Sequence, residues 1–140
     1  LAEDMINRLE LINENILNIS QYSTGLIDQY VVKLKDRIKE MLQTDIVDEA
    51  RISQEVVLYA DKTSIEEEIT RLKSHIVQFK ELLQSESIKK AGKRLDFIIQ
   101  EMNREVNTIG SKSNCLEITN LVIELKTELE DVREQVQNIE

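Results

Sequence analysis

The chain has 140 residues, no proline, three glycines and one cysteine, so few residues interrupt helices or form tight turns. Its formal net charge of −9 excludes a uniformly basic surface of the kind that binds nucleic acid along its whole extent. Aromatic residues make up only 4% of the chain and tryptophan is absent, which favours layered helix packing over a deep cofactor pocket.

The first half of the chain predicts three amphipathic helices, because apolar residues recur at alternating spacings of three and four. The first two are expected around residues 5–19 and 27–41, and a shorter third from about Asp45 to Asp61. Their apolar positions are Met5, Leu9, Ile12, Ile16 and Ile19, then Ile27, Val31, Leu34, Ile38 and Met41, and finally Ile52, Val56 and Tyr59.

The second half predicts three more helices. The fourth begins at Ser64, which forms a capping-box pattern with Glu67, and continues to Leu83. After a polar stretch at residues 85–92, a fifth is expected from about Lys93 to Ile109, with Gly110 at its end. The last begins at Asn114 and carries a heptad stripe formed by Ile118, Val122, Leu125, Leu129, Val132, Val136 and Ile139. We therefore expect an all-α fold of about six amphipathic helices, arranged as elongated antiparallel hairpins in a coiled-coil-like bundle.

The hydropathy of the chain, its first residues and its single cysteine indicate the cellular compartment of the protein. No apolar run approaches the roughly 20 residues of a membrane span, and no basic-then-apolar leader is present. Cys115 has no intrachain disulfide partner and no Cys or His neighbour at metal-site spacing. The chain begins at Leu1 without a methionine, already within an amphipathic pattern. We expect part of a larger cytoplasmic protein without a membrane association.

Charge is unevenly distributed along the chain. Residues 71–94 carry seven basic and two acidic side chains, whereas acidic residues predominate before and after them. The basic residues are Arg71, Lys73, Lys80, Lys89, Lys90, Lys93 and Arg94. A solvated charged face explains this pattern without any partner, and a strip that binds a polyanion is the alternative.

Four ordered segments resemble the C-terminal part of the YicC/YloC family of bacterial endoribonucleases. They are QEVVLYADK at residues 54–62, EEEITRLKSH at 66–75, GKRLDFIIQEMNREVNTIGSK at 92–112 and REQVQNIE at 133–140. The helices before residue 54 are also similar to the family's middle portion. The resemblance indicates a helical middle region at residues 1–62 and a C-terminal YicC-like helical domain at residues 63–140.

The resemblance implies an endoribonuclease that depends on a divalent metal, Mn²⁺ or Mg²⁺. It also implies a homo-oligomer, expected to be a hexamer, that encloses single-stranded or structured RNA as a clamp. It further implies an N-terminal domain that is absent from this chain, so this half alone is expected to be weak or inactive. The competing hypothesis is a non-catalytic helical scaffold for oligomerisation and interaction.

Metal-assisted cleavage requires oxygen ligands, usually one or two carboxylates for each ion. Glu101 and Glu105 lie one turn apart on the same flank of the fifth predicted helix and are our candidate catalytic and metal-binding residues. Ordinary surface charge pairing is the other explanation. His75 is a third catalytic candidate, but a metal-free mechanism that uses two histidines cannot be built from it alone. A hydrogen-bonded structural histidine is the alternative.

The candidate RNA contacts combine basic, amide and aromatic side chains, because guanidinium and ammonium groups bind phosphates and aromatic rings stack on bases. Packing against another helix or subunit is the other explanation for Phe97, which lies on the polar side of its helix. The candidates are Arg71, Lys89, Lys90, Lys93, Arg94, Phe97, Arg104, Asn107 and Lys112.

Overall fold

The computed structural model describes residues 2–43, 48–85, 88–113 and 115–139, with the side chains of residues 2, 88, 89 and 139 left out. The described part is all-α, as expected, and forms five helices rather than about six. These are α1 (Ala2–Leu42), α2 (Glu49–Thr63), α3 (Glu66–Ser85), α4 (Ile88–Lys112) and α5 (Leu116–Ile139). None of these described helices is both long and apolar enough to cross a membrane.

The two helices expected before residue 42 are one continuous helix of 41 residues, so the predicted count was wrong. The sequence shows a polar interruption after Ile19, but α1 continues through it. Thr24 Oγ1 donates a hydrogen bond to the Ser20 carbonyl oxygen over 2.9 Å, which satisfies this hydroxyl inside the helix. A break in the apolar stripe therefore marks where burial ends and not where the helix ends.

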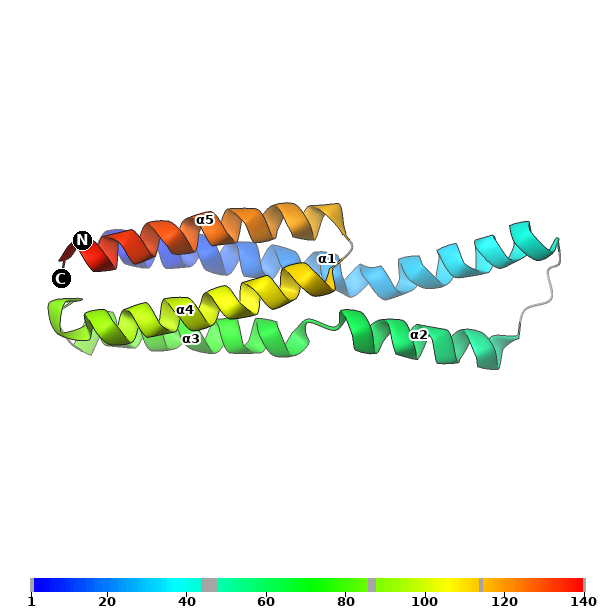
Figure 1. Cartoon of the computed structure of the whole chain (residues 1–140), viewed down its shortest axis with the longest axis horizontal. Helices are drawn as coiled ribbons and strands as arrows, with labels where there is room; N and C mark the ends of the chain where they lie inside the picture. Colours follow the sequence, from blue (N-terminus) through cyan, green and yellow to red (C-terminus); the bar gives the residue numbers. More distant parts are fainter. Residues whose placement is uncertain (1, 44–47, 86–87, 114, 140) are drawn as a thin grey trace.

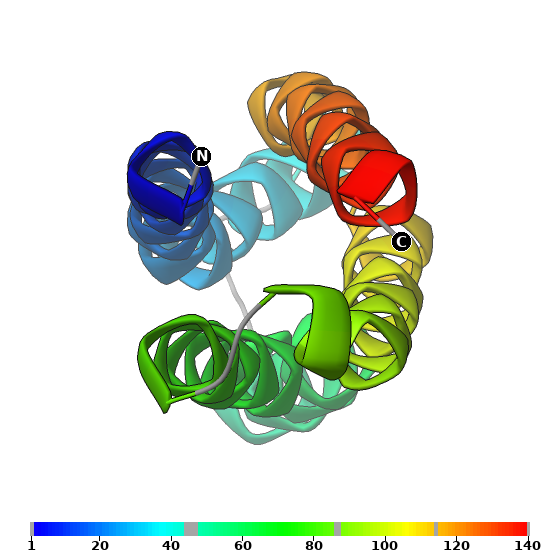
Figure 2. The same cartoon turned by 90° about the vertical axis from the view of Figure 1, so that its left-hand side faces the viewer.

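The helices form a four-helix bundle with a two-helix arm (Figure 1). The first half of α1 packs in the bundle with α3, α4 and α5, whereas its second half extends beyond the bundle and lies beside α2. Viewed along the long axis, α1 and α4 occupy opposite corners, with α3 and α5 between them (Figure 2). Neighbouring helices of the bundle run antiparallel, as the sequence predicts.

The core of the bundle consists of the apolar stripes predicted from the spacing. The α1 stripe from Met5 to Ile19 is buried, and so are the described heptad positions of α5 from Ile118 to Val136. In the described part of the arm, by contrast, only Ile52 is buried. The bundle thus contains nearly all the hydrophobic burial, and the arm has little core of its own.

The helix expected at Lys93–Ile109 is longer at both ends, because α4 runs from Ile88 to Lys112. Gly110 lies inside it, so its predicted role as a helix terminator was wrong. A Cβ atom at this position would lie 3.3 Å from Val122 Cγ1. Glycine here allows a close approach of α4 to α5, which a larger residue would disturb. The start predicted at Asn114 lies outside the described residues.

A short break separates α2 from α3. Asp48 caps the start of α2, where its carboxylate accepts a hydrogen bond from the Arg51 N–H over 3.3 Å. At the other end, the Ser64 N–H donates to the Ala60 carbonyl oxygen, so Ser64 acts as the C-terminal cap of α2. The division expected between residues 62 and 63 stays a prediction.

Candidate nucleic-acid interface

The buried apolar stripe of α4 determines which side of this helix faces solvent. Leu95, Ile99, Met102, Val106 and Ile109 are fully buried against the rest of the bundle. The opposite side of the helix must therefore face solvent. We call its exposed residues the α4 outer face, and they are Lys90, Lys93, Arg94, Phe97, Gln100, Arg104, Asn107 and Ser111.

The α4 outer face contains four basic residues and no carboxylate. Each of the other four helices exposes at least three Asp or Glu residues in its described part. This contrast arises in a chain with a net charge of −9. Since Lys and Arg attract phosphates and Asp and Glu repel them, this face is the part of the described surface most suited to a polyanion.

The carboxylates of α4 lie on its half-buried flanks, where polar groups of the protein contact them. Asp96 Oδ2 accepts a hydrogen bond from Gln100 Nε2 over 3.1 Å. Glu101 Oε1 lies 3.5 Å from Arg104 Nη1. Glu105 Oε1 accepts a hydrogen bond from Arg71 Nε of α3 over 2.8 Å. These contacts withdraw negative charge from the solvent-facing side of the helix.

Two of the predicted RNA-binding residues, Arg71 and Lys112, form ion pairs between α3 and α4, although the Arg71 side chain is still 49% exposed. Arg71 contacts Glu105 and also lies 3.6 Å from Glu67 Oε2. Lys112 Nζ lies 2.6 Å from Glu68 Oε1 and donates to the Ser64 carbonyl oxygen over 3.1 Å. Both cations hold the two helices together, so their charge is largely neutralised within the protein.

The pKa values of these residues reflect the ion pairs. Burial alone would raise the pKa of Glu68, but the hydrogen bond and positive charge of Lys112 lower it below the ordinary value. The hydrogen bond to Glu105 raises the pKa of Arg71 further above its ordinary value. Both the Glu68 carboxylate and the Arg71 guanidinium are therefore charged at neutral pH.

The three predicted catalytic residues come from two helices that pack together, His75 from α3 and Glu101 and Glu105 from α4. His75 follows Arg71 by one turn on α3, is half-buried, and has no hydrogen-bond partner for its buried Nδ1 in the described part. On α4, Glu101 precedes Glu105 by one turn. No contact here tests the catalytic role predicted for His75, whereas the ion pairs of Glu101 and Glu105 favour the alternative given for them, surface charge pairing.

In the described part of this chain, Glu101 and Glu105 are not gathered with other ligands into a metal centre. Among the described residues, no group of three or more His, Cys, Asp or Glu side chains is arranged to hold a metal ion. In addition, Glu101 and Glu105 each already contact a guanidinium group, from Arg104 and Arg71 respectively. A divalent ion would have to displace these cations and find further ligands.

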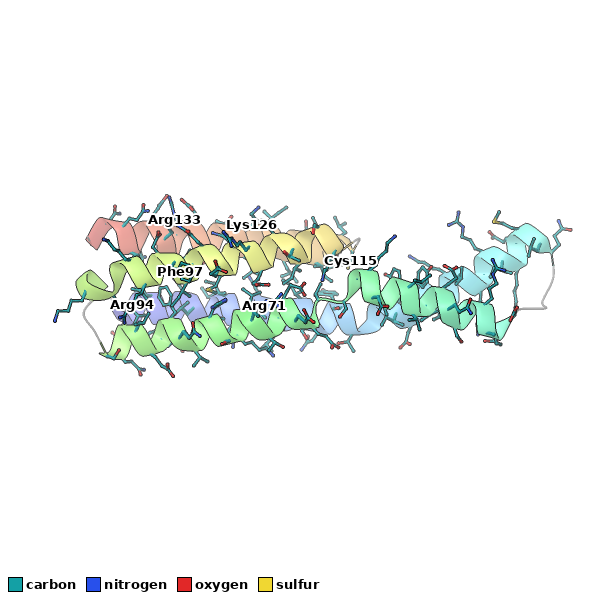
Figure 3. All side chains as sticks on the ribbon, turned by 60° about the horizontal axis from the view of Figure 1, so that its bottom comes forward. Arg71, Arg94, Phe97, Cys115, Lys126 and Arg133 are labelled. Atoms are coloured by element: carbon teal, nitrogen blue, oxygen red, sulfur yellow. The ribbon has the colours of Figure 1, made fainter. Side chains whose placement is uncertain are left out.

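A groove with an apolar floor lies between the second half of α3 and the first half of α4. Phe97 lines it and is 62% exposed, beside Lys93 and Arg94. In Figure 3, Arg94 and Phe97 lie toward the end of the bundle opposite the arm, and Arg133 lies on the neighbouring helix α5. Phe97 and two of the basic candidates, Lys93 and Arg94, therefore meet at one place on the molecular surface.

The structure thus groups most of the predicted RNA contacts. Lys90, Lys93, Arg94, Phe97, Arg104 and Asn107 share the α4 outer face, whereas the Lys89 side chain lies outside the described part. Gln100 and Ser111 were not predicted as contacts, although they occupy the same face. In the sequence, the positions of this helix that face away from its apolar stripe contain no Asp or Glu. This pattern would have identified Gln100 and Ser111 as part of the same face.

Comparisons with known proteins also indicate a family of RNA-cleaving enzymes. The family model described as endoribonuclease YicC-like, C-terminal, matches residues 19–140. A protein of Clostridioides difficile strain 630, named probable endoribonuclease YicC, is 54% identical over all of this chain and 47% of its own length. One of the same name from Haemophilus influenzae Rd is 40% identical over 67% of this chain and 32% of its own length. The chain spans about half the length of the first relative.

We predict that Glu68→Gln destabilises the protein at neutral pH. The substitution leaves Lys112 without its charged partner, and the Glu68 side chain is only 3% exposed. The loss is about 1–3 kcal/mol of unfolding free energy. Because the pKa of Glu68 is lowered on folding, its contribution is present above the ordinary value of 4.5 and disappears as the pH falls through the lowered value.

Thermal melts followed by circular dichroism at several pH values test this prediction. The difference between wild type and Glu68→Gln should be large at neutral pH and small in acid. Glu67→Gln is the matched control, since the Glu67 side chain is 85% exposed on the same helix and should change the melting temperature little. Equal melting temperatures for wild type and Glu68→Gln at neutral pH would contradict the role given to this ion pair.

Proposed function

The chain belongs to the YicC-like endoribonuclease family, and we propose that it is the helical, RNA-binding half of an endoribonuclease of the cytoplasm. RNA lies along the α4 outer face, and the full-length protein cleaves phosphodiester bonds. The chain spans only 47% of its Clostridioides relative, so residues beyond it are expected to complete the catalytic site.

The observation that carries the proposal is the absence of carboxylates from the α4 outer face. An RNA strand that approaches this acidic protein is repelled by the other helices and attracted to α4. Lys90, Lys93, Arg94 and Arg104 supply the cations, while Gln100 and Asn107 supply amide groups that hydrogen-bond to phosphate and sugar. Binding of this kind is mainly electrostatic and depends little on RNA sequence.

The divalent-metal requirement implied by the family resemblance stays a prediction for the full-length protein. Glu101 and Glu105 each contact a guanidinium group in this chain, so we assign no catalytic step to a metal held there. His75, with its unpartnered Nδ1, remains a candidate for proton transfer to or from a group supplied outside this half.

We predict that Lys93→Gln combined with Arg94→Gln weakens RNA binding and flattens its salt dependence. Each lost phosphate contact should reduce the slope of log K against log salt concentration by about 0.7 for a single strand. Binding of a fluorescent oligonucleotide to the full-length protein, titrated over a range of salt concentrations, measures this slope.

A matched control is Lys33→Gln combined with Arg37→Gln, since both residues are exposed on α1 among acidic neighbours. This control should leave the slope unchanged, although it removes the same number of charges. If both double variants flatten the slope equally, net charge alone determines binding, and the α4 outer face has no special role.

We predict that Glu101→Gln and Glu105→Gln leave the cleavage rate of the full-length protein close to wild type. Of the two, Glu105→Gln should lower the melting temperature more, because Glu105 contacts Arg71 across two helices whereas Glu101 contacts its own helix. Cleavage of a structured RNA and thermal melts of each variant measure the two effects.

The opposite outcome has a clear meaning. If cleavage collapses in both variants while melting temperatures stay unchanged, and excess Mg²⁺ or Mn²⁺ restores part of the rate, the two carboxylates are metal ligands after all. The guanidinium contacts of Glu101 and Glu105 would then have to be displaced during the reaction.

We also propose that the protein self-associates, and the family resemblance implies a hexamer. The arm supports this proposal, because it exposes Val32, Met41, Leu42, Val57 and Leu58 by 58% or more. Exposed apolar side chains gathered on two helices are typical of surfaces that bind another protein. A purely structural scaffold, the alternative function, would rely on the same surface.

We predict that Val57→Lys combined with Leu58→Lys reduces the size of the oligomer, because two charges in an apolar contact are costly to bury. Light scattering of the full-length protein at several concentrations measures the size. Val77→Lys is the control, since Val77 is 55% exposed on α3 outside the arm. An unchanged oligomer in the arm variant, or a monomeric wild type, would contradict the proposal.

A further inference from the structure

The groove beside Phe97 has the dimensions and chemistry of a small-ligand site. Its volume is about 580 Å³, and its floor and walls include Leu82, Phe97 and Ile98. This volume lies within the range of about 300–1,000 Å³ that small-molecule sites commonly show. The groove therefore has room for a single flat ring system beside the Phe97 side chain.

Phe97 is placed unusually for a residue of its type. The ring is 62% exposed, although the chain contains only two phenylalanines and the other, Phe79, is fully buried in the core. An exposed aromatic ring loses the hydrophobic stabilisation that burial would give, unless a ligand covers it. Nucleobases are well suited to this, because every base has a flat π face that stacks on an aromatic side chain.

The polar groups at the edge of the groove select the orientation of such a ring. Lys93 and Arg94 lie on the α4 side, where they continue the basic α4 outer face. Glu81 and Gln78 lie on the α3 side. Glu81 is the only carboxylate among the described residues that line the groove, so it is the acidic group available to the edge of a base stacked on Phe97.

We propose that this groove binds one unstacked base of single-stranded RNA and prefers bases with an exocyclic amine. The proposal rests on the RNA-binding function inferred above and names the class of substrate. The Glu81 carboxylate accepts hydrogen bonds from the amine of adenine, cytosine or guanine. Uracil has no amine, and its N3–H is flanked by two carbonyl oxygens that repel a carboxylate.

Duplex RNA does not satisfy the same groove. Its bases are already stacked and paired, and its strands present phosphate and sugar groups to a protein. A duplex uses the α4 outer face for its charge alone, whereas a single strand uses both the charge and the groove. The contribution of Phe97 is therefore specific to single strands.

The test compares variants of the full-length protein in fluorescence anisotropy with labelled oligoadenylate, oligocytidylate, oligouridylate and a blunt-ended RNA duplex without a loop. Phe97→Leu keeps an apolar side chain of similar size but removes the aromatic ring. It should weaken binding of the single strands about tenfold and leave duplex binding unchanged. Phe97→Trp, which keeps a stacking surface, should retain single-strand binding.

Tyr22→Leu is the matched control. Tyr22 is 48% exposed and also lines a surface groove, but no Lys or Arg lies among the residues of that groove. This variant should bind all four probes as wild type does. For the base preference, Glu81→Gln should reduce the advantage of oligoadenylate and oligocytidylate over oligouridylate, whereas Glu66→Gln on the same helix should preserve it.

The possible failures are distinguishable. If wild type binds no RNA probe, the proposed RNA-binding function fails and this inference fails with it. If RNA binds with a normal salt slope but Phe97→Leu behaves like Tyr22→Leu, only the base site is overturned. If Phe97→Leu keeps its RNA affinity but loses self-association in light scattering, a second copy of the chain covers the groove and the inference is likewise overturned.

Discussion

Burial of the apolar stripe of α4 is the constraint on which the rest of the structure depends. This stripe packs toward the bundle axis and turns the opposite side of the helix to solvent. Rotating α4 to present any other face would expose several large aliphatic side chains, each worth about 1.5–3 kcal/mol when buried. The hydrophobic effect therefore fixes the position of the basic residues, although it does not act on them.

The acidic residues of α4 lie on its half-buried flanks, whereas its charged residues that face solvent are basic. The carboxylates of Asp96, Glu101 and Glu105 are within reach of a protein donor or cation, and Glu68 is matched by Lys112 from the far end of α4. An ion pair at the boundary between core and solvent limits the cost of placing a charge there. The same pairs remove acidic groups from the exposed surface, so helix packing and surface potential have a common origin.

The sequence predicted the helical class and the buried stripes of the bundle, because burial there follows the spacing of Ile, Leu and Val. The stripe from Ile27 to Met41 was an exception, since it is half-buried or exposed in the arm. It predicted the helix ends less well. Thr24 satisfies its hydroxyl within α1, and Gly110 serves a close contact with Val122, so two apparent breaks are internal to helices. The Gly110 contact depends on a neighbouring helix, and the continuation of α1 through Thr24 depends on local hydrogen bonding. The spacing of apolar residues determines neither of them.

The candidate site was predicted as a set of residues but not as a surface. Arg71 and Lys112 resemble the other basic candidates in sequence, and only the antiparallel packing of α3 on α4 shows that they contact Glu105 and Glu68. The groove beside Phe97 likewise depends on Leu82 of the neighbouring helix. Contacts between residues distant in sequence decided which candidates face solvent.

The continuity of α1 determines how the arm is attached to the bundle. This helix runs through both the bundle and the arm and is about 60 Å long, while its neighbours α2 and α3 are separated by the break at Ser64 and Ile65. The arm is therefore joined to the bundle by an unbroken helix on one side and by a break between two helices on the other. Lys112 binds the Ser64 carbonyl oxygen at that break. This hydrogen bond ties the base of the arm to the end of α4, the helix that carries the basic face.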